Sequence, residues 1–205
     1  MEPQYRERII EESAQLFLRY GIRAVTMDFL ANEMGISKRT IYEIFRDKDD
    51  LLYAVFIYMG KKQMALIIPL IEKSETVIHA VFELLDIIGN HMRRINPLFF
   101  EDLKKYHHGV DKKLEGKRFD TDMSITMNIV ERGIKEGVFR DDINKNLVNR
   151  ALHGIFMITG DFNLFPREEF SRQEVVKDFF LNYLRGISTT KGFNLINICE
   201  REMLK

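Results

Sequence analysis

The 205-residue sequence contains a single cysteine and only 4 prolines, and these shortages exclude several protein classes. Cys199 has no partner for an intrachain disulfide, which fits a reducing compartment. The alternatives to an incidental thiol are a bond between subunits and a reactive thiol. With 12 glycines, 45% hydrophobic residues and 30% charged residues, the composition favours a helical globular protein over a disordered or collagen-like chain.

The sequence also lacks an excess of charge of either sign. Its 31 lysines and arginines balance 31 aspartates and glutamates, so no positive field over the whole protein indicates a nucleic-acid partner. The first 60 residues hold eight cations and ten acids. Any surface that binds nucleic acid must therefore be local.

Long apolar runs are absent as well. The N-terminal stretch MEPQYRERIIEESAQ contains no apolar segment of secretory length. No window approaches the roughly 18 uninterrupted apolar residues that a membrane-spanning helix needs. We therefore expect a soluble, cytoplasmic protein without a membrane partner.

No catalytic or cofactor motif is recognisable in the sequence. A Gly-x-Ser-x-Gly elbow, a glycine-rich phosphate loop and a coherent set of nucleophile and base are all missing. The five histidines have neither the i, i+4 spacing nor the partner cysteines of a zinc site. The prediction is a protein that is not an enzyme and has no metal and no cofactor.

What the sequence does contain is helical periodicity along most of its length. Apolar spacing, capping residues and terminal glycines predict an all-α fold of about nine helices. The predicted segments are 4–20, 26–35, 37–46, 47–69, 75–94, 96–108, 112–136, 144–160 and 171–188. Pro69 is expected to end or kink the fourth helix. The tail from residue 189 either forms a short helix or lies loose.

Two short helices separated by a turn around Gly35 form the pattern of a helix-turn-helix, whose second helix enters the DNA major groove. The first turn of that second helix carries residues 38–40, with sequence Lys-Arg-Thr, where a probing helix presents its side chains. Ile41 and Phe45 lie one turn apart and are expected to face the domain interior. The alternative is a generic helical corner with a solvated Lys-Arg pair.

The segment TMDFLANEMGISKRTIYEIFRDKDDLL, residues 26–52, resembles the signature of TetR-type (tetracycline-repressor-like) transcriptional regulators. It combines Thr-x-x-x-Leu-Ala, Gly-Ile-Ser, Thr-Ile-Tyr and Lys-x-x-Leu at the intervals usual in that family, preceded by the matching set Ile10, Ala14, Phe17 and Gly21. The close match covers residues 9–55, and the rest of the chain is similar only in layout.

This resemblance implies two domains: residues 1–47 as a helix-turn-helix DNA-binding domain, and residues 48–205 as a helical domain for ligand binding and dimerisation. It also implies which residues touch DNA: Thr26, Ser37, Lys38, Thr40, Tyr42 and Lys48. We add Arg39, which either reads a base or is solvated.

The last two predicted helices carry apolar residues on more than one side, one more than a core requires. The surplus side suits a two-fold four-helix contact between subunits. Its predicted members are Leu147, Ala151, Gly154, Ile155, Val176, Phe180, Tyr183 and Ile187. The alternative is a helix pair fully buried within one chain.

Aromatic and methionine side chains in the second domain are candidates for the lining of an apolar ligand pocket. They are Phe82, Phe99, Phe100, Tyr106, Met123, Met127, Phe156 and Met157. The same residues serve equally well as core, since the sequence holds 16 phenylalanines and 10 methionines.

Together these features favour a homodimeric regulator of transcription that a small-molecule effector controls. The hypothesis is a repressor released from a palindromic operator in double-stranded DNA by an inducer. The alternative from another class is a helical small-molecule carrier or enzyme whose N-terminal helices do not bind DNA. An activator or a corepressor-dependent protein differs only in the sign of the coupling between ligand and DNA.

Overall fold

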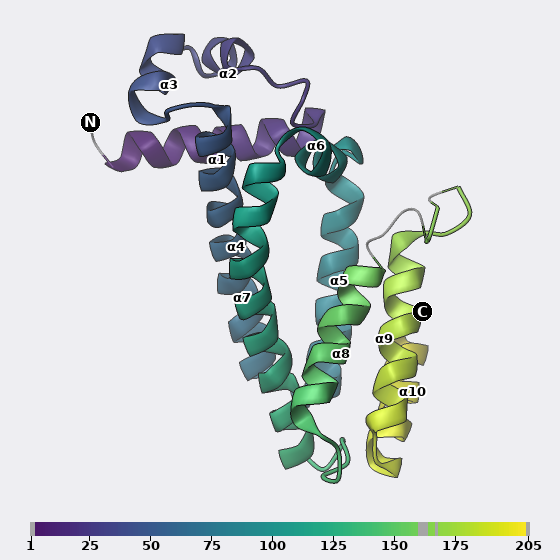
Figure 1. Ribbon diagram of the computed structural model, residues 1–205. Coiled ribbons are helices and arrows are strands. Elements are labelled where there is room, and N and C mark those ends of the chain that lie inside the picture. Colours follow the sequence, from purple (N-terminus) through teal and green to yellow (C-terminus); the bar gives the residue numbers. More distant parts are fainter. Residues whose placement is uncertain (1–2, 160–163, 167, 204–205) are drawn as a thin grey trace. The chain divides into compact units, whose positions relative to one another are not determined.

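The computed structural model is all-helical, as predicted (Figure 1). It describes residues 3–159, 164–166 and 168–203, without the side chains of 3, 91–94, 115–122, 156, 172–173 and 203. The helices in the described part are α1 Pro3–Tyr20, α2 Met27–Met34, α3 Lys38–Ile44, α4 Lys48–Lys73, α5 Val77–Arg94, α6 Leu98–Tyr106, α7 His108–Lys135, α8 Lys145–Ile158, α9 Arg172–Ile187 and α10 Thr190–Met203. Helices α1 to α9 correspond to the nine predicted segments, and α10 shows that the tail takes the helical one of the two outcomes left open for it.

Side-chain caps begin several of these helices at the predicted residues. The hydroxyl of Thr26 accepts a hydrogen bond from the Phe29 amide at the start of α2. Ser37, Asn144 and Ser171 do the same for α3, α8 and α9. Such caps are local in sequence, which is why the boundaries of these helices were predictable.

Helix α4 passes through Pro69 and ends at Lys73, so of the two outcomes expected at this proline the helix end is wrong. The turn beyond Pro69 is held by hydrogen bonds that do not involve the proline nitrogen. The Ser74 hydroxyl donates to the Leu70 carbonyl over 2.7 Å, and the Arg132 guanidinium donates to the Ser74 carbonyl over 2.6 Å. These contacts offset the one backbone hydrogen bond that the proline removes.

Two compact units make up the chain, and each is described by itself. Unit 1 comprises Met1–Leu66 and His91–Arg118, and its core joins the N-terminal helices to α6. Phe17, Phe45 and Phe99 are the largest fully buried side chains there. Because Phe99 and its neighbour Leu103 belong to α6, residues distant in sequence complete the core beneath the first three helices.

Unit 2 comprises Ile67–Asn90 and Phe119–Lys205. Within it, the Glu136 carboxylate accepts a hydrogen bond of 2.8 Å from the Val77 amide at the start of α5. The same carboxylate forms an ion pair with Arg132. A helix N-terminus leaves amides without partners in the helix, and this carboxylate satisfies one of them. Helix α9 packs against both α8 and α10.

By length and composition alone, α4 is long and apolar enough to cross a membrane, and it is the one such helix in the part of the chain that the structure describes. Core helices of globular proteins pass the same test. The first half of α4 is a core helix of unit 1, since Leu51, Leu52 and Val55 are completely buried there.

Helix α10 is fixed at its start to the turn that follows α7. The Thr189 amide donates to the Val138 carbonyl over 3.0 Å, and the Thr189 hydroxyl donates to the Gly137 carbonyl over 2.8 Å. At Gly192 the approach is so close that an added Cβ would lie 2.0 Å from the Val138 carbonyl oxygen. Only glycine permits this contact, because the obstacle is backbone.

Replacing Gly192 by alanine is therefore expected to destabilise the protein by about 1–3 kcal/mol, the usual cost of overpacking. Urea denaturation followed by circular dichroism measures this free energy of unfolding. Gly186→Ala, at an exposed position of α9, is the matched control, because nothing lies within 4 Å of its added Cβ. We expect it to be neutral or up to about 1 kcal/mol more stable. Equal effects at both glycines would contradict the close contact.

Candidate nucleic-acid interface

Helices α2 and α3 are joined by a tight turn, residues 35–37, whose geometry follows from its sequence. Gly35 adopts φ 64°, a left-handed conformation in which a Cβ is strained, and it caps the end of α2. The next amide, of Ile36, donates to the Ala31 carbonyl over 3.0 Å. Ser37 then caps α3, so that the chain reverses from one helix into the next within three residues.

The inward side of α3 is anchored in the core of unit 1. Ile41 and Phe45 are both completely buried, together with Leu30 of α2. Their burial removes the inner face of α3 from solvent and leaves its outer face on the surface. The structure thus has the two-faced arrangement that the apolar spacing predicted.

The outer face of α3 carries polar side chains that reach into solvent. The side chain of Arg39 is 88% exposed, and Tyr42 is 45% exposed. Lys38 and Glu43 lie on the same exposed side. This face can therefore donate hydrogen bonds to an approaching molecule from a guanidinium, an ammonium and a phenol.

The hydroxyls predicted to touch DNA lie at the helix starts, where they also act as caps. Thr26 Oγ1 accepts from the Phe29 amide and Ser37 Oγ accepts from the Thr40 amide, each over 3.1 Å. Ser37 and Thr40 share a hydrogen bond of 2.7 Å between their hydroxyls. An accepting hydroxyl can still donate its own proton, so capping is compatible with a phosphate contact.

Each cation in α3 and just beyond it is paired with a carboxylate. Lys38 Nζ lies 2.6 Å from Asp28 Oδ2, and this hydrogen bond raises the pKa of Lys38. Arg39 pairs with Glu43 over 3.0 Å within one turn of the same helix. Arg46 pairs with its neighbour Asp47 over 2.9 Å. The surface is consequently rich in donors and nearly neutral in charge.

Lys48 is half-buried, and its ammonium faces the corner between α1 and α2. Lys48 Nζ donates to the Ile22 carbonyl over 2.6 Å and lies 5.8 Å from the centre of the Phe17 ring. Burial lowers the pKa of Lys48. In this conformation the side chain stabilises the loop before α2 instead of extending to the surface.

A buried carboxylate from α6 holds the same loop. Asp102, only 7% exposed, accepts a hydrogen bond of 2.8 Å from the Arg23 amide. The Arg23 guanidinium donates to the Tyr106 hydroxyl over 3.1 Å. Asp102 was not among the predicted site residues, although an acid between Phe99 and Leu103 on one apolar helix face is a signal that could have identified it.

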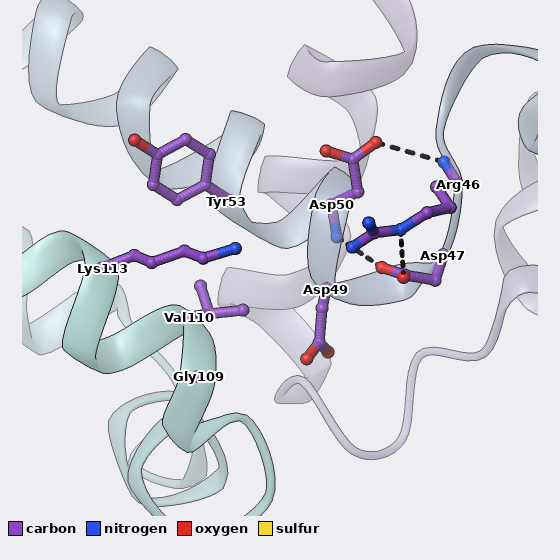
Figure 2. Close-up of a pocket in the computed structure, with 8 residues that line it drawn as sticks. All are labelled: Arg46, Asp47, Asp49, Asp50, Tyr53, Gly109, Val110 and Lys113. Atoms are coloured by element: carbon purple, nitrogen blue, oxygen red, sulfur yellow. Dashed lines mark hydrogen bonds and ion pairs between the residues drawn. The ribbon is translucent and has the colours of Figure 1, made fainter.

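A pocket of about 640 Å³ lies in unit 1 at the first turns of α4 and α7 (Figure 2). Its lining residues are Arg46, Asp47, Asp49, Asp50, Tyr53, Gly109, Val110 and Lys113. Lys113 extends toward the aspartates of α4 in Figure 2. Five of the eight lining residues are charged, and none of the eight residues predicted for an apolar ligand pocket belongs to the lining.

The residues predicted for a ligand pocket lie in both units. In unit 1, Phe99 is fully buried against the rings of Phe56 and Phe100, whereas Tyr106 is 46% exposed. The others with described side chains belong to unit 2: Phe82 is buried, Met123 and Met127 are half-buried, and Met157 is exposed. The side chain of Phe156 lies outside the described residues.

The residues predicted for a dimer contact all lie on α8 and α9, which pack against each other. Leu147 is 65% exposed, and Val176 and Ile187 are buried. The rest are half-buried: Ala151, Gly154, Ile155, Phe180 and Tyr183. Phe179 of α9 and Phe193 of α10 are exposed and were not predicted.

Residues 9–55 match the family model described as bacterial regulatory proteins, tetR family. The chain is also 28% identical over 139 residues to the uncharacterized HTH-type transcriptional regulator YhgD of Bacillus subtilis (strain 168). That alignment covers 66% of this chain and 72% of the Bacillus protein. The segment matched by the family model contains the whole surface of α2 and α3 described above.

Solved structures share the fold beyond that segment. A TetR transcription regulator from Haloarcula marismortui ATCC 43049 has a TM-score of 0.74, with 18% identity over 92% of this chain and 100% of that chain. A putative transcriptional regulator from Saccharomonospora viridis in complex with choline has a TM-score of 0.72, with the same identity and coverage. At this identity the likeness shows the fold alone.

Because Asp102 satisfies the Arg23 amide, Asp102→Ala is expected to cost about 1–3 kcal/mol of stability by leaving a buried donor without an acceptor. Asp102→Asn retains an oxygen that can accept this hydrogen bond, so it is expected to cost less. Urea denaturation of both variants measures the difference. If Asp102→Asn is as unstable as Asp102→Ala, the loss of the hydrogen bond to the Arg23 amide is not the cause of the lower stability.

Proposed function

The chain belongs to the tetR family of bacterial regulatory proteins, which are DNA-binding regulators of transcription, and on this premise we propose that it is a homodimeric repressor controlled by a small-molecule effector. The observation that carries the proposal is the outer face of α3. It presents Lys38, Arg39 and Tyr42 to solvent above a fully buried pair, Ile41 and Phe45.

In the proposed complex, residues 1–47 are the DNA-binding domain and α3 lies in the major groove. The Lys38 ammonium and the Tyr42 phenol donate to phosphates, and Thr40 and Arg39 face base edges. Thr26 and Ser37 add hydroxyl donors at the starts of α2 and α3. These side chains supply the proposed contacts at a helix end whose free amides also favour an anion.

Lys48 has a different place in the proposal, because its ammonium is engaged with the Ile22 carbonyl. A phosphate contact requires this side chain to leave that carbonyl or to share its ammonium with the phosphate. An ammonium has three donors, so sharing is chemically available. We therefore keep Lys48 in the proposed set as a shared donor.

Residues 48–205 are the proposed domain for dimerisation and effector binding. Two DNA-binding domains related by two-fold symmetry would match a palindromic operator with half-sites about 34–36 Å apart. An effector that prefers a different separation of these domains would release the DNA, and a coupling of about 1–3 kcal/mol suffices for regulation. The choline of the Saccharomonospora structure illustrates an effector-sized ligand in a similar fold.

The relatives that match are named as transcriptional regulators, and we propose that this protein acts by binding and not by catalysis. A regulator of bacterial transcription works where the chromosome is, so a cytoplasmic location follows from the proposal. The rival hypothesis remains a helical small-molecule carrier or enzyme, and it predicts no affinity for any particular duplex.

Selection of binding sites from a random duplex pool, followed by gel-shift titration, tests the DNA contacts. Lys38→Ala and Tyr42→Phe are each expected to weaken operator binding by about 3- to 20-fold, the effect of losing one donor to a phosphate. Lys61→Ala, which removes an exposed cation farther along α4, is the control and is expected to change little. If the wild-type protein enriches no palindromic sequence, the proposed function is wrong.

Leu147→Glu tests the proposed dimer contact, because a charge at an exposed apolar position is harmless unless a second subunit covers it. Sedimentation equilibrium is expected to show a dimer for the wild type and at least a 10-fold weaker association for the variant. Asn146→Glu, at an exposed polar position in the same turn of α8, introduces the same change of charge and is the control. A variant that remains fully dimeric would exclude Leu147 from the interface.

A further inference from the structure

The surface of α2 and α3 has no surplus of positive charge. Residues 26–48, all of which the structure describes, contain four cations and four acids: Lys38, Arg39, Arg46 and Lys48 against Asp28, Glu33, Glu43 and Asp47. Non-specific DNA binding derives almost entirely from cations that neutralise phosphates and release counterions. A neutral surface is therefore poorly suited to binding random sequences.

The three exposed ion pairs of this surface differ in how they are built. The Arg39–Glu43 pair lies within one turn of α3, and Arg46 and Asp47 are adjacent in sequence. A change of side-chain rotamer separates such partners easily, because each long side chain is exposed. These pairs resemble the local pairs of many helix surfaces, which contribute little.

The Lys38–Asp28 pair instead connects two helices. Asp28 lies in the first turn of α2 and Lys38 is the first residue of α3, and their charged atoms are 2.6 Å apart. The distance between them is set by the turn at Gly35 and by the buried residues beneath both helices. The packing of α2 against α3 therefore keeps the backbones of Asp28 and Lys38 within ion-pairing reach of each other.

This placement has two consequences for a phosphate that approaches Lys38. The Asp28 carboxylate repels the phosphate in every complex, specific or not. The carboxylate also favours lysine conformations with the ammonium beside Asp28, which helps only a complex whose register places a phosphate there. A carboxylate near the N-terminus of a helix interacts favourably with the helix dipole. The position of Asp28 in the first turn of α2 therefore stabilises α2 in the free protein as well.

We propose that Asp28 is a specificity-determining residue of the DNA interface, which suppresses binding to random sequences while it orients Lys38 for the operator. This inference rests on the proposed function. Removal of the charge is expected to relieve repulsion in all complexes and to lose the orienting contact in the operator complex alone. The affinity for random DNA therefore rises more than the affinity for the operator.

The test compares Asp28→Asn with the wild type on two duplexes: the palindrome that the wild type selects from a random pool, and a mixed-sequence duplex of equal length. Asp28→Asn is expected to bind the mixed duplex about three- to fivefold more tightly, with a smaller gain on the palindrome, the size of effect an exposed ion pair allows. The ratio of the affinity for the palindrome to the affinity for the mixed duplex therefore falls. On the mixed duplex, the plot of the logarithm of the binding constant against the logarithm of the salt concentration is expected to be steeper by about one for Asp28→Asn than for the wild type.

Two controls isolate the contact. Glu33→Gln removes the same charge from α2 at an exposed position that forms no ion pair with the four cations among the described residues, and it is expected to leave the ratio unchanged. In a Lys38→Gln background, Asp28→Asn is expected to leave the ratio unchanged as well, because the orienting contact is already lost. Thermal unfolding by circular dichroism checks that α2 remains folded in each variant.

An equal gain on both duplexes, or a ratio that still falls in the Lys38→Gln background, would overturn this inference and leave the proposed function intact. The inference is also overturned if Glu33→Gln lowers the ratio as much as Asp28→Asn does. A wild-type protein that selects no palindrome overturns the proposed function itself.

Discussion

The proposed DNA-binding surface depends on the burial of Ile41 and Phe45. Helix α3 has seven residues, too few to be stable in water by itself. It exists because Ser37 caps its start and because its inner face is covered on all sides by the core of unit 1. The positions of Lys38, Arg39 and Tyr42 on the outside follow from that anchoring, since helical geometry fixes one face relative to the other.

Long-range polar contacts hold the loop that leads into this pair of helices. The Arg23 amide and the Ile22 carbonyl find partners in Asp102 and Lys48, which lie 79 and 26 residues away in sequence. Buried backbone groups without partners would cost free energy, so these two side chains hold the loop in its conformation. Asp102 belongs to α6, and the core of unit 1 likewise draws Phe99 and Leu103 from that helix.

The electrostatics of the surface differ from what a basic DNA-binding face suggests. The cations of α3 are present at the positions where a recognition helix carries them, yet each is offset by a carboxylate. Affinity in such an arrangement must come from directed hydrogen bonds more than from net charge. The equal numbers of cations and acids in the chain are consistent with binding that depends on how well the surface fits one DNA sequence.

Helix caps and apolar spacing were readable from the sequence because each involves residues within about four positions of one another. This is why Thr26, Gly35, Ser37 and the inward pair Ile41 and Phe45 were predicted correctly. The formation of α10 and the continuation of α4 past Pro69 were each one of two outcomes that the sequence left open, because the contacts that decide them, such as Thr189 with Gly137 and Arg132 with Ser74, join residues more than 50 positions apart. The residues of the proposed site could be named from the sequence, but their hydrogen-bond and ion-pair partners could not.

The sequence by itself determined that the protein is all-helical, where the helix-turn-helix lies, and which side of α3 faces inward, since these depend on local hydrogen bonds and on the periodicity of apolar residues. Only the tertiary structure decided that Asp28 lies against Lys38, that Lys48 turns toward Ile22, and that Asp102 is buried beside Arg23. Side-chain pairing between elements depends on how the elements pack, and packing is a property of the folded chain as a whole.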